Sequence, residues 1–257
     1  MTDTPAPGRA TDHPANDPGT ARVADSGATG FGGKLAFEDR GYRAAVVDLL
    51  GAIAYGELSA FERLVDDAKL APTLGDKMEL SAMAAAEFGH VPPLVKRITE
   101  LGADAVAAME PFVEPFDSFH AHTAPRDWLE GLVKAYVGDG LAADFYREVA
   151  AFLDRDTRDL IIDSLDDSGQ SGFAIDRVRA AIAGDHRVGG RLALWGRRLM
   201  GEALSQAQRV AADRDALTAL LAGGVDRPGM DLAALGRMFT RLTENHTRRM
   251  AELGLDS

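Results

Sequence analysis

Cysteine is absent from the sequence, which removes several classes of protein from consideration. A disulfide scaffold, a zinc finger, an iron–sulfur cluster and a thiol nucleophile all depend on cysteine. No apolar run approaches 18 residues, so we expect no membrane-spanning helix and no membrane partner. Residues 1–10 lack the apolar segment of a secretory signal, so we expect a cytoplasmic protein.

Basic residues are also scarce, with 28 lysines and arginines against 40 aspartates and glutamates. The net charge of −12 argues against a protein that coats nucleic acid. Residues 41–184 hold 25 of the acidic residues and only 13 basic ones, so this part is either a solvated surface or a source of ligands for a hard cation. The basic residues of 185–257 are all arginine, and we interpret them mainly as side chains that cover helix faces rather than as phosphate contacts.

The chain divides into a tail and a helical domain. Residues 1–34 are rich in proline and glycine and poor in large apolar side chains, so they cannot bury enough area to offset the entropy of ordering. We expect this tail to be disordered. Residues 35–257 show helical periodicity and no convincing strand pattern, which predicts an all-α fold. We place a four-helix core at about 37–184 and two additional C-terminal helices at about 187–253.

Apolar periodicity and helix-breaking residues set the predicted boundaries. The expected helices cover about 37–70, 76–101, 127–153, 156–183, 187–221 and 231–253. Pro92 and Pro93 should kink the second helix, or stop it so that it restarts. Pro111 and Pro115 interrupt the connector 103–125, where we expect a short helix and then a loop.

Polar residues stand in line with the core positions of the first four helices. They are Glu57, Glu87, His90, Asp139, Asp167 and Gln170. Glu87 and His90 are three residues apart and therefore share one helical face. Each half of the core repeats one scheme, a single carboxylate followed one helix later by a carboxylate-x-x-polar pair. Carboxylates cluster stably in a core when a cation neutralises them, so the scheme predicts a metal site; Asp144 is the alternative to Asp139.

This pattern resembles the ferritin-like di-iron superfamily and, within it, the bacterial tRNA-(ms2io6A)-hydroxylase-like (MiaE-like) proteins. Segments 83–88 (MAAAEF), 134–140 (KAYVGDG) and 191–198 (RLALWGRR) carry the resemblance, which spans roughly residues 35–225. The resemblance implies a ferritin-like four-helix bundle with a carboxylate-bridged di-iron site that activates O2. It also implies hydroxylation of an unactivated carbon, which in MiaE belongs to a modified tRNA adenosine.

The resemblance also implies a role for each ligand. Glu57 and Asp139 would be terminal ligands, Glu87 and Asp167 would bridge the two irons, and His90 would hold one of them. Aspartate stands where the superfamily usually has glutamate, at Asp139 and Asp167. These are the residues that we expect to hold iron, together with Gln170.

Gln170 stands where a second histidine is expected. An amide oxygen is a poorer donor to iron than imidazole, so we predict an incomplete second metal position. The alternative is a bundle that has lost its chemistry and acts as a structural or interaction protein; iron oxidation or storage is a third interpretation. The acidity of the chain argues against tRNA and favours a smaller substrate, and a homodimer is a candidate assembly. His120 and His122 form a further histidine pair, for which we favour no metal role.

Overall fold

The computed structural model describes residues 39–165, 170–222 and 230–256, and every regular element in these ranges is a helix. The bundle consists of α2 (Arg40–Asp67), α3 (Leu74–Glu100), α6 (Trp128–Ala150), α7 (Arg155–Ser164) and α8 (Gln170–Gly184). Three further helices follow, α9 (Arg187–Asp213), α10 (Asp215–Ala222) and α11 (Leu232–Glu252). The all-α prediction is confirmed, and the disorder predicted for 1–34 lies outside the described residues.

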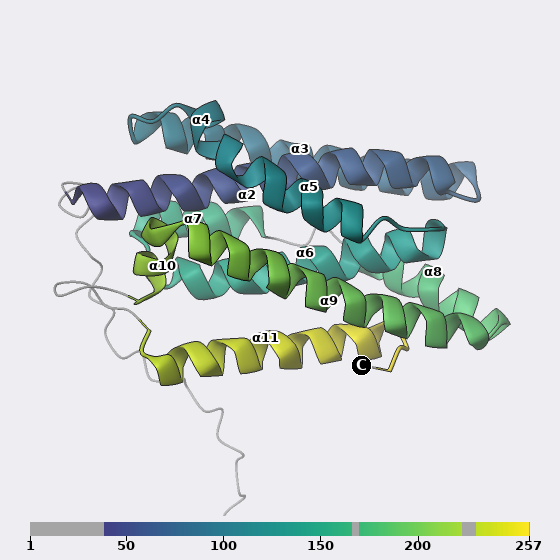
Figure 1. The fold of residues 1–257 in the computed structure, drawn as a ribbon. Helices are drawn as coiled ribbons and strands as arrows, with labels where there is room; N and C mark the ends of the chain where they lie inside the picture. Colours follow the sequence, from purple (N-terminus) through teal and green to yellow (C-terminus); the bar gives the residue numbers. More distant parts are fainter. Residues whose placement is uncertain (1–38, 166–169, 223–229, 257) are drawn as a thin grey trace, which may run out of the picture.

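Helix α2 is the centre of the molecule, with α3, α4 (Ala105–Met109), α6 and α10 packed around it (Figure 1). Its N-cap, Asp39, accepts hydrogen bonds from two backbone amides of the first turn, which fixes where the helix begins. Gly51 allows α4 to approach closely, because a Cβ atom there would lie 2.1 Å from the carbonyl oxygen of Ala108. Gly51 thus allows the backbone of α2 to contact the backbone of α4 directly.

The segment Arg40–Leu70, which joins α2 to the 3-10 turn η1 (Ala68–Leu70), is more apolar than the sequence analysis allowed. One 18-residue window has a mean hydropathy of 1.5, so by length and composition alone this helix could cross a membrane. Half of that window is buried inside the protein, as expected for the central helix of a bundle. The sequence holds no uninterrupted apolar run of 18 residues, but scattered polar residues hardly lower the average over such a window.

Two predicted helices are each split in two. The fourth, expected over 156–183, is divided into α7 and α8, and Leu165 already lies in a turn; the run of Asp, Ser and Gly that follows disfavours helix. The fifth, expected over 187–221, breaks at Arg214, whose Nε lies 3.1 Å from a carboxylate oxygen of Asp48. This ion pair directs α10 across α2, which apolar periodicity does not reveal.

Prolines interrupt the helices less than the sequence suggests. Helix α3 continues through Pro92 and Pro93 as one helix. The connector is also more helical than expected, because α4 is followed by a 3-10 turn η2 (Glu110–Phe112) and by α5 (Val113–His122). Pro111 and Pro115 occupy first-turn positions of η2 and α5, where a missing amide proton costs no helical hydrogen bond.

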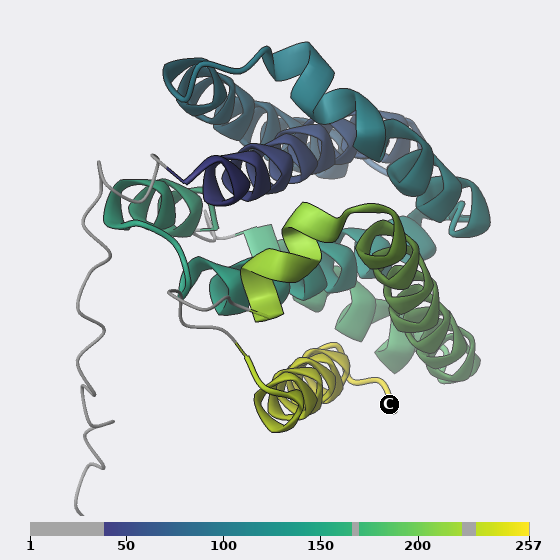
Figure 2. The same ribbon diagram turned by 60° about the vertical axis from the view of Figure 1, so that its left-hand side comes forward.

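Helix α11 lies on the side of the bundle remote from α2 and α3 and packs against α6 and α9 (Figures 1 and 2). Its buried residues recur every four positions, as an amphipathic helix requires, and are Met238, Leu242, His246 and Met250. Met250 fits against Gly196 of α9, where a Cβ atom would lie 2.4 Å from its sulfur. Arg241 makes a two-pronged ion pair with Glu148 of α6 at 2.6 and 2.7 Å.

Candidate metal centre

Helices α2 and α3 bring Glu57, Glu87 and His90 together in the bundle. One ligand atom from each of these residues can be chosen so that all lie within 4.8 Å of one another. Glu57 is buried, and Glu87 and His90 are partly buried. The three-residue spacing on α3 therefore does place both side chains on the face that meets α2.

The carboxylate of Glu57 is the common partner of the cluster. Its Oε2 lies 3.1 Å from Nδ1 of His90, and its carboxyl group is hydrogen-bonded to that of Glu87. Gly56 makes room beside it, because a Cβ atom there would meet the ring of Phe116 at 3.2 Å and the hydroxyl of Tyr146 at 3.4 Å. The lack of a side chain at Gly56 thus lets Phe116 and Tyr146 pack closely against α2.

The cluster holds more negative charge than the protein interior tolerates. Burial, the hydrogen bond from Glu57 and the charges of Asp139 and Glu57 all raise the pKa of Glu87 far above its ordinary value. The hydrogen bond to Glu57 raises the pKa of His90 against the opposing effect of its burial. Two carboxyl groups in contact require a proton or a cation between them. Two oxygen donors and one imidazole nitrogen are a donor set that fits iron, so the residues present suit a metal ion.

Helix α6 directs Asp139 and Asp144 to different surroundings. The charge of Asp139 raises the pKa of both Glu87 and His90, so its carboxylate is close to the α2–α3 cluster. Asp144 instead pairs with Arg249 of α11 and lies 3.7 Å from Arg147. The two aspartates are five residues apart, about 140° around the helix, so they cannot share one face. Asp139 is thus the aspartate whose charge reaches the cluster, but it is exposed and lies outside the group of ligand atoms within 4.8 Å, so its role as a ligand stays a prediction.

Tyr146 is a neighbour of the cluster that the sequence analysis did not single out. Burial, followed by the charges of Glu57 and Asp139, raises the pKa of its hydroxyl. Its position seven residues after Asp139 places both on the same side of α6, and this spacing could have revealed it.

The second half of the predicted ligand set is not described to the same extent. Asp167 lies outside the described residues, and Gln170 is described only as the first residue of α8. Their assignment as metal ligands therefore stays a prediction from the sequence. The internal repeat holds only in part, because a Cβ atom at Gly138 would meet nothing within 4 Å, whereas Gly56 is tightly packed.

A second group of buried charges lies further along α2 and α6 and was not anticipated. Asp67 and Lys134 interact electrostatically; burial raises the pKa of Asp67 to about 6 and lowers that of Lys134 to about 8.

Burial likewise lowers the pKa of His120 to about 3, so this residue is neutral. His122 bonds to the carbonyl oxygen of Ser118 at 2.8 Å. The two histidines therefore lie in different surroundings, because Nδ1 of His120 is buried without a hydrogen-bond partner and His122 is exposed.

Several arginines of the C-terminal part have partners within the protein. Arg249 pairs with Asp144, Arg241 with Glu148, and Arg198 donates to the carbonyl oxygen of His122 at 2.6 Å. These contacts agree with the interpretation of these arginines as structural.

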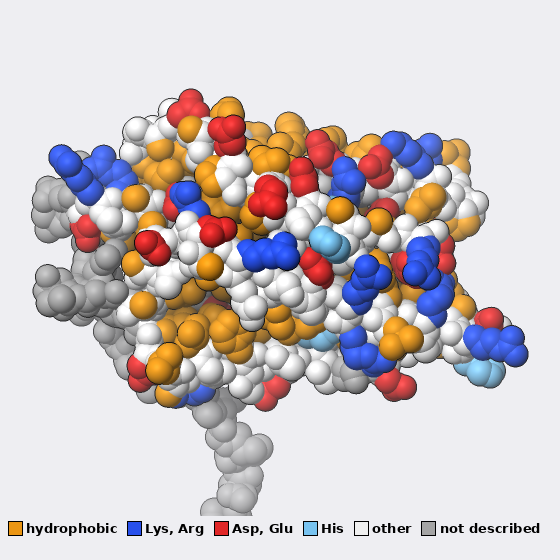
Figure 3. All heavy atoms as spheres, viewed as in Figure 1, with side chains coloured by type: hydrophobic (Ala, Val, Ile, Leu, Met, Phe, Trp, Pro, Cys, Tyr) orange, Lys and Arg blue, Asp and Glu red, His pale blue; other side chains and the backbone are white. Residues whose placement is uncertain are grey.

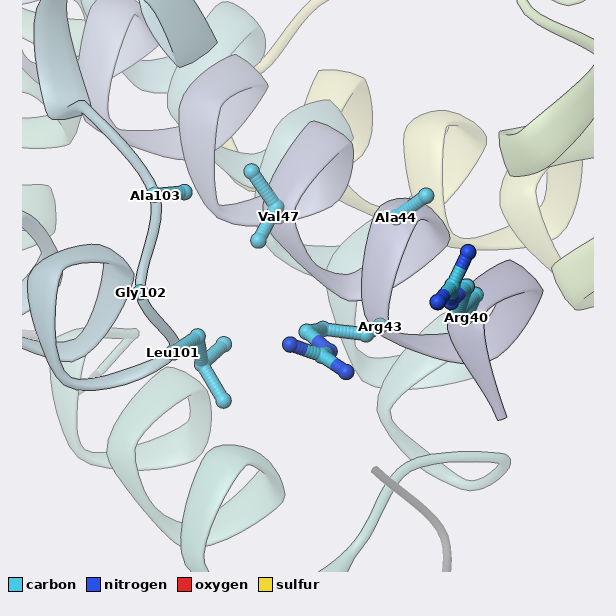
Figure 4. Close-up of a pocket in the computed structure, with 7 residues that line it drawn as sticks. All are labelled: Arg40, Arg43, Ala44, Val47, Leu101, Gly102 and Ala103. Atoms are coloured by element: carbon cyan, nitrogen blue, oxygen red, sulfur yellow. The ribbon is translucent and has the colours of Figure 1, made fainter. Parts of the chain in front are cut away.

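A groove of about 310 Å³ lies beside the first turns of α2 (Figure 4). Arg40 and Arg43 flank it, and its apolar lining includes Val47, Leu101 and Ala103. Arg43 is 14 residues before Glu57, about 21 Å along the helix, so the groove is separate from the metal-type cluster.

Comparison with known protein families agrees with this architecture. Residues 40–224 match a protein-family model described as a ferritin-like domain of actinomycetes. The match begins at the first residue of α2 and ends just beyond α10, so it leaves out α11. No curated protein matches the chain.

Proposed function

Because the chain belongs to the family of ferritin-like domains of actinomycetes, we propose that its bundle binds iron and acts as an O2-activating hydroxylase. One observation carries the proposal. The carboxylates of Glu57 and Glu87 and the imidazole of His90 converge from two helices with ligand atoms within 4.8 Å. Asp139 of α6 is exposed and lies outside this group, although its charge acts on Glu87 and His90. The ligand roles of Asp139, Asp167 and Gln170 are assigned from the sequence pattern alone.

Iron bound there would supply a Lewis acid and a redox-active centre for O2. The protein's own residues orient the donors and limit access by water. Glu57 holds His90 by the 3.1 Å contact, and Phe61 packs on Phe88 with ring centroids 5.3 Å apart, beside Glu87. Tyr146 keeps its proton at neutral pH, because burial and the neighbouring carboxylates raise the pKa of its hydroxyl. It therefore remains a hydrogen-bond donor next to the cluster.

The resemblance to MiaE-like proteins supports hydroxylation, whereas the charge of the chain opposes their substrate. A protein with a net charge of −12 repels a polyanion such as tRNA at long range. We therefore assign a substrate smaller than tRNA and without strong negative charge. A cytoplasmic location stays part of this proposal.

The test is iron loading in air, with iron per chain and O2 consumption as readouts. Wild-type protein should retain iron after desalting and consume O2 when Fe(II) is added. Glu87→Gln keeps the size of the side chain but removes its charge, and His90→Ala removes the imidazole; both should lose most of the bound iron. Glu79→Gln, on the exposed side of the same helix, should behave as wild type.

Circular dichroism of each variant must show unchanged helicity for the comparison to count. If folded wild-type protein retains no iron, the hydroxylase proposal fails, and the bundle is a structural or interaction protein. The glutamine at position 170, where a second histidine is expected, would agree with that outcome. If Glu79→Gln loses as much iron as Glu87→Gln, binding is adventitious and the assignment of the cluster is wrong.

A further inference from the structure

Helix α3 presents an outward surface that carries no charge. This surface, called the α3 face, consists of eight exposed residues, Leu74, Met78, Ser81, Ala82, Ala85, Phe88, Gly89 and Pro92. Their spacing of three and four residues places them along one side of the helix. Charged residues make up 26% of the chain, so one side of a helix that runs for five turns without a charged residue is unusual for a solvated surface.

The exposed side chains of the α3 face are large as well as apolar. Leu74 is 75% exposed, Met78 is 65% exposed and Phe88 is 46% exposed. Val65 and Leu70 extend the apolar surface onto the end of α2 and η1. These five make up half of the ten large hydrophobic residues that are exposed in the described part of the chain. Helix α3 lies at the upper edge of the molecule in Figure 1, and Figure 3 shows hydrophobic side chains among charged ones along that edge.

The size of this surface is in the range of a protein interface. From Leu74 to Pro92 the helix rises about 27 Å, and with the adjoining end of α2 the surface is about 20 Å wide. Its projected area is then on the order of 500 Å², and the accessible area of protruding side chains is larger than the projection. A standard interface takes about 800 Å² from each partner, and weaker ones take about 600 Å².

The charges around the α3 face allow it to meet an identical surface. Lys69 is paired with Asp66 at 2.6 Å, and Lys96, one turn beyond Pro92, lies 3.7 Å from Glu100. Lys77 and Glu79 flank the first turns of α3, so these rim charges balance. Two copies of a chain with a net charge of −12 repel each other, and contact is least costly where neither copy carries charge. A twofold axis requires one surface to fit itself, which a neutral apolar face satisfies. An anionic membrane would instead require a basic rim.

We propose that the α3 face is the interface of a homodimer, in which it packs against the α3 face of a second copy. The small residues Ala82, Ala85 and Gly89 lie in the middle and allow the two helices to approach closely; a Cβ atom at Gly89 would meet nothing within 4 Å in the single chain. Leu74, Met78 and Phe88 supply the apolar area. The interface is independent of iron, because Glu87 and His90 lie on the opposite side of α3.

Sedimentation velocity of the full chain, from about 1 to about 100 µM, tests the proposal. Wild type should approach twice the monomer mass of 27.3 kDa as its concentration rises. Met78→Glu and Met78→Lys should each raise the dimer dissociation constant at least about tenfold, because either charge would be buried against the partner. The two signs separate burial from a change in net charge. Leu194→Glu is the matched control, since Leu194 is also 65% exposed but lies on α9.

A wild-type protein that stays monomeric over this range overturns the proposal. So does a dimer that survives both Met78 substitutions, or one that Leu194→Glu weakens equally, because the interface then lies elsewhere. If the Met78 variants lose helicity, Ala85→Lys replaces them, since Ala85 is an exposed helical position where lysine is well tolerated.

Discussion

Asp66 and Asp67 are neighbours in the sequence, but their carboxyl groups have opposite acidities. The hydrogen bond from Lys69 lowers the pKa of Asp66, whereas burial raises that of Asp67 to about 6 from 3.8. Asp67 is buried against α6, where a Cβ atom at Gly131 would lie 3.0 Å from its carboxyl group. Helix position, more than residue type, decides the chemistry of each carboxylate.

Asp67 should therefore cost stability at neutral pH. An acid whose pKa is raised on folding favours the folded state below the unfolded pKa of 3.8, and this contribution is lost as the pH rises through about 6. Between pH 4 and pH 7, the free energy of unfolding of Asp67→Asn should rise relative to wild type by up to about 3 kcal/mol. Urea denaturation at both pH values measures the change.

Asp66→Asn is the control for this experiment, since its carboxyl group is exposed and its pKa is shifted the other way. Its effect relative to wild type should be small and opposite in sign, because the stabilisation from a lowered pKa is lost as the pH falls. A difference between Asp67→Asn and wild type that does not vary with pH would contradict the assigned burial of charge.

Gln170 yields a second prediction at this scale. Since an amide oxygen is a weaker donor to Fe(II) than imidazole, the two metal positions should fill unequally in the wild type. Gln170→His should raise the iron content toward two per chain, measured by elemental analysis after loading in air. Equal binding of two irons by the wild type would show that Gln170 does not limit the second position. Glu87→Ala, with its helicity checked, should abolish binding at both.

Apolar periodicity predicted well which segments form helices, but it predicted poorly where those helices break. Helix α3 was expected over 76–101 and runs from Leu74 to Glu100, because its buried positions repeat without interruption. The end of α7 at Leu165 was not predicted, and the break at Arg214 depends on a partner, Asp48, that is distant in sequence. Ion pairs between distant helices leave no periodic signal.

Close contact between α2 and α4 leads to a prediction about Gly51. Gly51→Ala would place a methyl group about where the carbonyl oxygen of Ala108 lies, and backbone cannot move away as a flexible side chain can. We expect a loss of about 1 to 3 kcal/mol or more in the free energy of unfolding, measured with urea. Gly201→Ala is the control, because nothing lies within 4 Å of its Cβ position and alanine favours helix by up to about 1 kcal/mol. Equal stability of the two variants would refute the close approach.

For the whole molecule, the sequence predicted the ferritin-like fold and three residues that converge, Glu57, Glu87 and His90. These could be found because each interrupts an apolar seam at a fixed spacing. Tyr146 was missed because tyrosine fits an apolar seam, and the pair of Asp67 and Lys134 was missed because single charges on a helix resemble solvated ones. Residue spacing therefore identifies a polar residue that interrupts an apolar seam, but not a residue such as tyrosine that fits the seam.

The overall charge predicts how the protein meets nucleic acid. With a net charge of −12, it should bind total tRNA only weakly at about 150 mM salt. Electrophoretic mobility of labelled tRNA, titrated with protein, checks this expectation. Tight binding that weakens steeply as salt is added would restore tRNA as the substrate.

Helix α11 can be regarded as a ligand of the rest of the protein. It lies beyond the region that matches the ferritin-like family, and it is held by a row of four buried residues and by the contacts of Arg241 and Arg249 with α6. A chain that ends at Ala222 and a synthetic peptide of residues 230–256 would then form a complementary pair. Titration calorimetry of that pair would measure the dissociation constant of the α11 peptide. The contribution of this helix to the fold would then be expressed as a binding free energy.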